Sequence, residues 1–221
     1  MGGSSSKHSK LFDKLFANAI DLIRQSAHSH ELDRVMEAAM EGDTEAVEQL
    51  RHEQQEKAME MNRAVLMELW NEFDENGDGV LSREENRRLV HQYLVASKIH
   101  LPKVMEESLR VSMELGLSAI EAQDPSMAHD MRKELKAVMK TIKKDLTAGV
   151  VSVLDEILAN VDETADALLA EMDIDGDGQV DREEFITKFL AATSAVIKPE
   201  RFQAATSSAM AAANEALHGE E

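Results

Sequence analysis

Two segments of twelve residues place oxygen-bearing side chains at alternate positions around a pair of glycines. Residues 74–85 have the sequence DENGDGVLSREE, and residues 173–184 have the sequence DIDGDGQVDREE. A hard divalent cation such as Ca²⁺ takes about six to eight oxygen ligands, which a short loop can supply only if it turns sharply. Glycine at the sixth position of each segment, Gly79 and Gly178, permits that turn. The spacing therefore predicts two calcium-binding loops.

The position of each residue in its loop gives it a role as a ligand. In the first loop we expect side-chain oxygens from Asp74, Asn76 and Asp78, a backbone carbonyl from Val80, a direct or water-mediated ligand at Ser82, and two carboxylate oxygens from Glu85. In the second loop the same roles fall to Asp173, Asp175, Asp177, Gln179, Asp181 and Glu184. The first set holds three carboxylates and the second holds five. Because ligand charge tunes affinity, we expect the second loop to bind Ca²⁺ more tightly and to accept Mg²⁺ better.

Both loops match the twelve-residue calcium loop of the EF-hand superfamily at every diagnostic position. The resemblance implies a helix before and a helix after each loop. Ser82 with Glu85, and Asp181 with Glu184, have the spacing of capping pairs at the start of such exit helices. In the superfamily a short strand, which would include Leu81 or Val180 here, pairs one loop with another.

The two loops are far apart along the chain, with 99 residues from Asp74 to Asp173. Calmodulin-like proteins, which the loops resemble, usually place paired hands about one hand-length apart. Three arrangements remain open from the sequence. The loops meet after the intervening helices fold back, each loop pairs with a degenerate hand, or each pairs with a second chain in a homodimer.

Composition and periodicity predict an all-α protein with a flexible N-terminal arm. The resemblance of the loops implies that two EF-hand units are embedded in its longer helices. The chain is 43% hydrophobic but 4% aromatic, and it contains three prolines. Apolar residues recur at helical spacing in residues 11–25, 32–69, 85–101, 103–121 and 127–172, with breaks at Gly42-Asp43, Pro102 and Asp124-Pro125 and a possible kink at Gly149. Each loop is followed by a helix and then by a proline, Pro102 or Pro199, which indicates a tandem repeat. We divide the chain into residues 1–30, 31–122 and 126–221.

The N-terminus fits the pattern for N-myristoylation, with Gly2 exposed after removal of Met1 and serine at the sixth position. A single myristoyl chain binds a membrane only marginally, so a second signal is needed. The amphipathic segment 7–23, with its lysines, is the candidate, and its alternative role is a core helix that packs on the hands. Residues 1–10 should be disordered alone. The combination is similar to the recoverin-like neuronal calcium sensors, which join an N-myristoyl group to EF-hands.

Charge and composition exclude several classes of function. The formal net charge of −19 disfavours nucleic acid as a direct partner. The chain has no cysteine, which excludes disulfides, thiolate metal sites and S-palmitoylation. We find no plausible catalytic pairing, so we do not expect an enzyme. No apolar run resembles a membrane span or a secretory signal, and we expect the protein in the cytoplasm, at the cytosolic face of a membrane.

The leading functional hypothesis is a membrane-associated calcium sensor. Calcium would reorient the helices beside each loop and expose apolar side chains to a helix of a partner protein. The side chains expected to take part are Trp70, Phe73, Phe185 and Phe189. The alternatives are a calcium buffer, which binds the ion but barely opens, and a helical scaffold that calcium stabilises.

Overall fold

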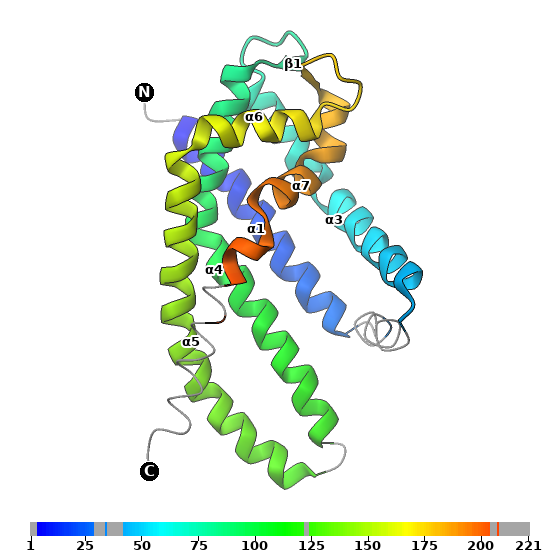
Figure 1. The fold of residues 1–221 in the computed structure, drawn as a ribbon, viewed down its shortest axis with the longest axis vertical. Helices are drawn as coiled ribbons and strands as arrows, with labels where there is room; N and C mark the ends of the chain where they lie inside the picture. The colour runs from blue at the N-terminus through cyan, green and yellow to red at the C-terminus, as the bar shows by residue number, and fades with distance from the viewer. Residues whose placement is uncertain (1–3, 29–33, 35–41, 122–123, 204–206, 208–221) are drawn as a thin grey trace.

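A computed structural model describes residues 4–28, 34, 42–121, 124–203 and 207. The fold is all-α, apart from two strands of two residues each (Figure 1). Its elements are α1 (Ser4–His28), α3 (Thr44–Phe73), β1 (Val80–Leu81), α4 (Arg83–Glu121), α5 (Pro125–Ala159), α6 (Val161–Met172), β2 (Val180–Asp181), α7 (Arg182–Ile197) and the 3₁₀ helix η1 (Pro199–Phe202). None of the described helices is long and apolar enough to cross a membrane.

Helix α1 corrects the prediction of a flexible arm, because it is helical from Ser4 and packs on the rest of the protein. Its apolar face, Leu11, Phe12, Leu15 and Phe16, is buried. The apolar spacing that predicted a helix from residue 11 continues toward the N-terminus through His8, whose ring stacks on Phe73 at 4.8 Å between centroids. Tertiary packing thus orders residues that would be disordered alone. Residues 1–3 lie outside the described residues.

Two of the predicted helix boundaries are wrong. Helix α4 continues through Pro102, where a break was expected. Proline in a helix interior costs about 3 kcal/mol or more, because it removes a hydrogen bond and crowds the preceding turn. Here Leu101, Val104 and Met105 pack against the core around the proline, and this burial holds both halves of α4 in one helix.

The second wrong boundary lies in the predicted helix over residues 127–172. The chain bends at Asn160 and not at Gly149, so this stretch forms α5 and α6. The N–H of Asn160 bonds to the carbonyl of Ile157 at 3.0 Å, and its side-chain amide donates to Glu156 O at 3.0 Å. These local bonds satisfy the last carbonyls of α5 and allow the chain to turn.

Two of the predicted breaks, at Gly42-Asp43 and Asp124-Pro125, lie at helix starts. The side chain of Asp43 accepts a hydrogen bond from Ala46 N, and that of Asp124 accepts from Ser126 N and Met127 N. Both are N-caps of the kind that short acidic side chains provide. The helical pattern predicted before Gly42 falls largely outside the described residues.

Helices α4 and α5 form a long antiparallel hairpin, which returns the chain from the first loop to the second (Figure 1). The hands share one apolar core beside this hairpin. Within it the rings of Trp70 and Phe185 lie 5.7 Å apart, and those of Tyr93 and Phe189 lie 5.5 Å apart. The predicted repeat of the helices that follow each loop is not matched in detail, since Pro102 lies inside α4 whereas Pro199 begins η1.

Candidate metal centre

The two loops meet within one chain. Strands β1 and β2 pair in an antiparallel manner, with Val80 opposite Asp181 and Leu81 opposite Val180. Leu81 and Val180 are almost fully buried, at 1% and 0% exposure. Of the three arrangements left open by the sequence, the structure therefore shows the first, in which the intervening helices fold back and bring the loops together.

The backbone of each loop turns at its glycines. Gly77 and Gly79 have φ values of 69° and 86°, and Gly176 and Gly178 have values of 77° and 84°. A side chain at a left-handed position of this kind strains the backbone, which explains why glycine stands at the fourth and sixth positions of both loops. The turns direct the side chains of the first half of each loop toward its inside.

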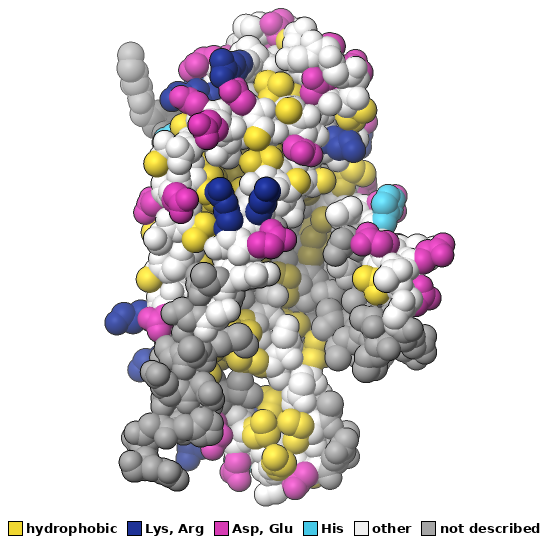
Figure 2. Space-filling view, viewed as in Figure 1, with side chains coloured by type: hydrophobic (Ala, Val, Ile, Leu, Met, Phe, Trp, Pro, Cys, Tyr) yellow, Lys and Arg dark blue, Asp and Glu magenta, His cyan; other side chains and the backbone are white. Residues whose placement is uncertain are grey.

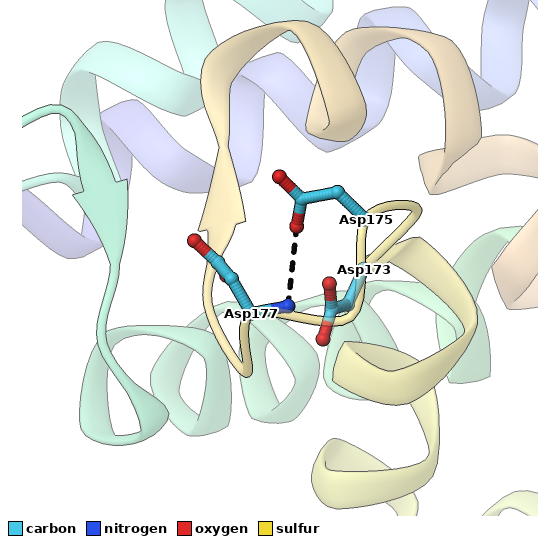
Figure 3. Close-up of side chains that lie close together, drawn as sticks. All are labelled: Asp173, Asp175 and Asp177. Atoms are coloured by element: carbon cyan, nitrogen blue, oxygen red, sulfur yellow. Dashed lines mark hydrogen bonds between the residues drawn. The ribbon is translucent and has the colours of Figure 1, made fainter.

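The second loop brings three carboxylates together. Ligand oxygens of Asp173, Asp175 and Asp177 lie within 4.8 Å of one another, and Figure 3 shows the three side chains around one space. Backbone N–H groups of the loop hold them in place, with Asp177 N donating to Asp175 Oδ1 at 3.1 Å and Gly178 N to Asp173 Oδ2 at 2.9 Å. Like charges this close repel each other unless a cation lies among them. This donor set fits a calcium ion.

A buried glutamate closes each loop. In the second loop Glu184 accepts from Ile174 N at 2.7 Å and from Asp181 N at 2.9 Å, so one carboxylate joins the start of the loop to its end. In the first loop Glu85 accepts from Glu75 N at 3.0 Å and from Ser82 N at 2.9 Å. In each loop the two carboxylate oxygens thus reach opposite ends of the loop, and the bidentate binding of calcium by Glu85 and Glu184 stays a prediction.

Hydrogen bonds favour the ionised form of Glu85. Burial raises its pKa, but hydrogen bonds from the hydroxyl and the backbone N–H of Ser82, and from the N–H groups of Glu75 and Asn76, outweigh burial and hold the pKa below its usual value. The carboxylate is therefore charged, as a ligand of a divalent cation must be.

The first loop arranges its charges differently. The side-chain amide of Asn76 donates to Asp78 Oδ2 at 2.9 Å, so an amide occupies the place of the central aspartate of the second loop. Asp74 accepts from Gly77 N at 2.9 Å and from Gly79 N at 3.3 Å, as its counterpart Asp173 does. All twelve predicted ligand positions lie in the two loops, and the assignment of a ligand atom to each stays a prediction.

Sequence reasoning missed the contacts that join the two hands behind the loops. Asn86, fully buried at the start of α4, donates from Nδ2 to the carbonyl of Ala165 in α6 at 2.7 Å. Nearby, Arg83 forms an ion pair with Asp166, and Arg87 forms one with Asp162. Each pair also raises the pKa of its arginine through the hydrogen bond to the aspartate. These partners are about eighty residues apart, so no local pattern could reveal them.

Comparison with known protein families agrees with this geometry. A family model described as EF hand matches residues 71–90 and 165–190, which include both loops and the ends of the flanking helices. No curated protein and no solved structure matches the chain. The family matches support two EF-hands and calcium binding, and they do not extend to the recoverin-like sensors.

Proposed function

We propose that this EF-hand calcium-binding protein is a calcium sensor that works at the cytosolic face of a membrane. The observation that carries the proposal is the position of α1, whose apolar face lies on both helices of the first hand. A helix held on the hands by non-covalent contacts can leave them, and its departure uncovers apolar surface. A calcium buffer needs no such cover.

Aromatic rings form the centre of the contact between α1 and the first hand. Phe12 packs against Phe73 of α3 and Tyr93 of α4, with centroids 6.4 and 5.9 Å away. Phe16 stacks on Tyr93 at 5.8 Å and on His100 at 5.3 Å. Because α1 contacts the helices on both sides of the loop, a change in the angle between α3 and α4 alters the surface that α1 occupies.

Hydrogen bonds and ion pairs surround this apolar face, including one from Asn18 to the buried Asn62 at 2.9 Å. Lys14 approaches Glu68 of α3 at 3.9 Å, and both side chains are more than half exposed. At the other end of α1, Arg24 reaches Glu107 of α4 at 2.6 Å. Exposed ion pairs contribute roughly 0–1 kcal/mol each, so most of the affinity of α1 comes from its four buried apolar residues. Such an interface can be shifted by a ligand that prefers one arrangement of the hands.

A bound calcium ion supplies the positive charge that the loop carboxylates lack. Glu85 and Glu184 would pass the binding event to the exit helices. Each stands at the start of its exit helix and accepts a hydrogen bond from the second residue of its loop. We propose that the second site also accepts Mg²⁺, because its five carboxylates raise its affinity for small divalent cations.

The proposed partners are a membrane surface and a helix of a target protein. Gly2, the proposed myristoylation site, would provide one membrane contact, and the released face of α1 with Lys7, Lys10 and Lys14 would provide the second. The target helix would take the surface that α1 leaves. Trp70, Phe73, Phe185 and Phe189 are at most 3% exposed in the structure, so a target can reach them only after such a release.

Hydrophobic-dye fluorescence with a parallel calorimetric calcium titration tests the proposal. We expect calcium to raise dye fluorescence, and Phe12→Ser to raise it without calcium, because the substitution weakens the cover. Ala17→Ser, on the exposed side of the same helix, is the matched control and should behave like the unaltered protein. Calcium binding with unchanged dye fluorescence would indicate a buffer.

Co-sedimentation of the myristoylated protein with liposomes tests the membrane contact. Equal partitioning with calcium and with chelator would refute it.

One observation favours a second candidate, the helical scaffold. The α4–α5 hairpin extends well beyond the hands, and hydrophobic side chains gather at its tip (Figures 1 and 2). Met127, near the turn, is 54% exposed. Light scattering distinguishes the candidates, since a stable oligomer that is unaffected by chelator would favour the scaffold. The same measurement tests the possible homodimer, which pairing of the loops does not require.

A further inference from the structure

A cavity of about 350 Å³ is lined in part by Tyr93, and none of its described lining residues belongs to a calcium loop. Its walls come from the exit helices of both hands, α4 and α7, and from the turn that leads into η1. In Figure 1, α7 and η1 run across α4. The volume falls within the range of about 300–1,000 Å³ that is typical of small-molecule sites.

The walls of the cavity are apolar. They are formed by Leu101 and Met105 from α4, Leu190 and Ile197 from α7, and Phe202 from η1. Three hydroxyl groups also line it, those of Tyr93, Ser97 and Thr193. Ser97 and Thr193 already donate to backbone carbonyls of their own helices, at 2.8 and 2.9 Å. These two hydroxyls therefore have no proton left to donate to a ligand.

Tyr93 is held within the same polar cluster. Burial raises the pKa of its hydroxyl, and hydrogen bonds with Thr193 and Ser97 partly oppose the rise. The phenol is thus neutral and already has partners. The part of the cavity lined by Tyr93, Ser97 and Thr193 can contact a ligand of matching shape through van der Waals interactions, and these residues carry no charge.

Among the described residues that line the cavity, Lys198 alone carries a positive charge. It is exposed and therefore lies at the opening, together with Ser194. Within the described part of the chain, no carboxylate lies within ion-pair distance of the Lys198 ammonium. Lys198 is also the single described non-glycine residue with a positive φ, 45°, and backbone strain of this kind is concentrated at ligand-binding positions.

We propose that this cavity binds a single-chain fatty acid, with the acyl chain between α4 and α7 and the carboxylate at Lys198. The apolar walls fit a hydrocarbon chain, and Lys198, the cation among the described lining residues, fits one negative charge. Ligands with several charged groups do not fit, because the described residues inside the cavity carry no charge to receive them. The site is distinct from the surface under α1, and it goes beyond the proposed sensor function.

Titration calorimetry with dodecanoate tests the proposal on the full chain without an acyl group on Gly2, so that any bound chain is the added one. We expect saturable binding of one dodecanoate in calcium or in chelator, below the concentrations at which micelles or calcium soaps form. Lys198→Gln should weaken dodecanoate binding roughly fivefold, as for an exposed charge pair, and leave dodecanol binding unchanged. Lys188→Gln, which removes an exposed charge of the same helix outside the cavity, is the control.

A second pair of variants tests the location of the chain. Ser194→Trp places a large side chain at the cavity and should weaken binding of both dodecanoate and dodecanol more than tenfold. Ala195→Trp, at the next residue on the exposed side of α7, should weaken neither. Circular dichroism and calcium titration show that each variant is folded. Absence of binding in both conditions, equal effects of the two lysine variants, or equal effects of the two tryptophan variants would overturn the proposal.

Discussion

The two hands have the same loop backbone but differ in the charge of the loop and in what surrounds them. Both loops turn at two glycines with positive φ, and both end at a buried glutamate. At the third position, between the two other ligands of the first half, the first loop has the amide of Asn76 and the second has the carboxylate of Asp175. A shared backbone therefore carries two different electrostatic fields, and we expect two different affinities.

The surroundings of the hands differ as much as their loops. The first hand has an entering helix of 30 residues and an exit helix of 39, and α1 packs on both. The second has an entering helix of 12 residues and an exit helix of 16, which borders the proposed fatty-acid cavity. Under the proposed function, the first hand would release α1, and the second hand would bind calcium more tightly.

Removing the closing glutamate of each loop is expected to have the largest effect. Glu184→Gln should weaken the tighter step of a calcium titration, and Glu85→Gln should weaken the other step. Charge-assisted contacts contribute about 1.5–3 kcal/mol, which corresponds to a loss of roughly tenfold to hundredfold in affinity at the altered site. Calorimetry measures both, with Glu183→Gln and Glu84→Gln as exposed controls next to each site. If the first site binds more tightly, the proposed order of affinities is wrong.

Removing the hydrogen bond between Asn86 and Ala165, which joins the two hands, should have the next largest effect on the protein. Asn86→Ala removes the hydrogen bond to Ala165 O, which joins the start of α4 to α6. We expect about 0.5–1.5 kcal/mol less stability in chemical denaturation, as for the loss of one hydrogen bond, and less cooperative calcium binding. Asn71→Ala, at an exposed position of α3, should change neither. Equal cooperativity in the two variants would show that the hands communicate by another route.

Exchanging the central side chains should reduce the difference between the loops. Asn76→Asp adds a carboxylate to the first loop and is expected to raise its calcium affinity roughly fivefold. Asp175→Asn removes one from the second loop and should lower its affinity by a similar factor. Parallel titrations measure both changes, and they would contradict the electrostatic explanation if the two affinities moved in the same direction.

The smallest expected effect concerns the support that α1 gives to the first hand. A hydrogen bond from Arg110 lowers the pKa of Glu107 to about 2, with help from Arg24 of α1 and against the effect of burial. The stability from this charge is complete above the usual glutamate pKa of about 4.3 and is lost as the pH falls toward 2. Glu107→Gln should remove about 1 kcal/mol at pH 7 and flatten the fall of stability in that interval. Thermal melts between about pH 2 and 7 measure both, and an unchanged slope would contradict the assignment.

Local sequence patterns predicted the parts of the fold that depend on local chemistry. The loops were recognisable because glycine and oxygen ligands must stand at fixed positions in one short segment. The breaks at Gly42-Asp43 and Asp124-Pro125 were recognisable from their turn-forming residues, and the structure adds that both aspartates cap the helices that follow. The errors at Pro102 and Asn160 arose where buried packing outweighed a breaker, or where one asparagine redirected the chain through its own hydrogen bonds.

The sequence by itself determined that two loops bind a hard cation, and which of them carries more negative charge. The tertiary structure decided that the loops pair with each other, that α1 covers the first hand, and that a cavity remains between the two exit helices. The physical reason is distance along the chain. A ligand loop is complete within a dozen residues, whereas Asn86 and Ala165 meet only because the α4–α5 hairpin folds back.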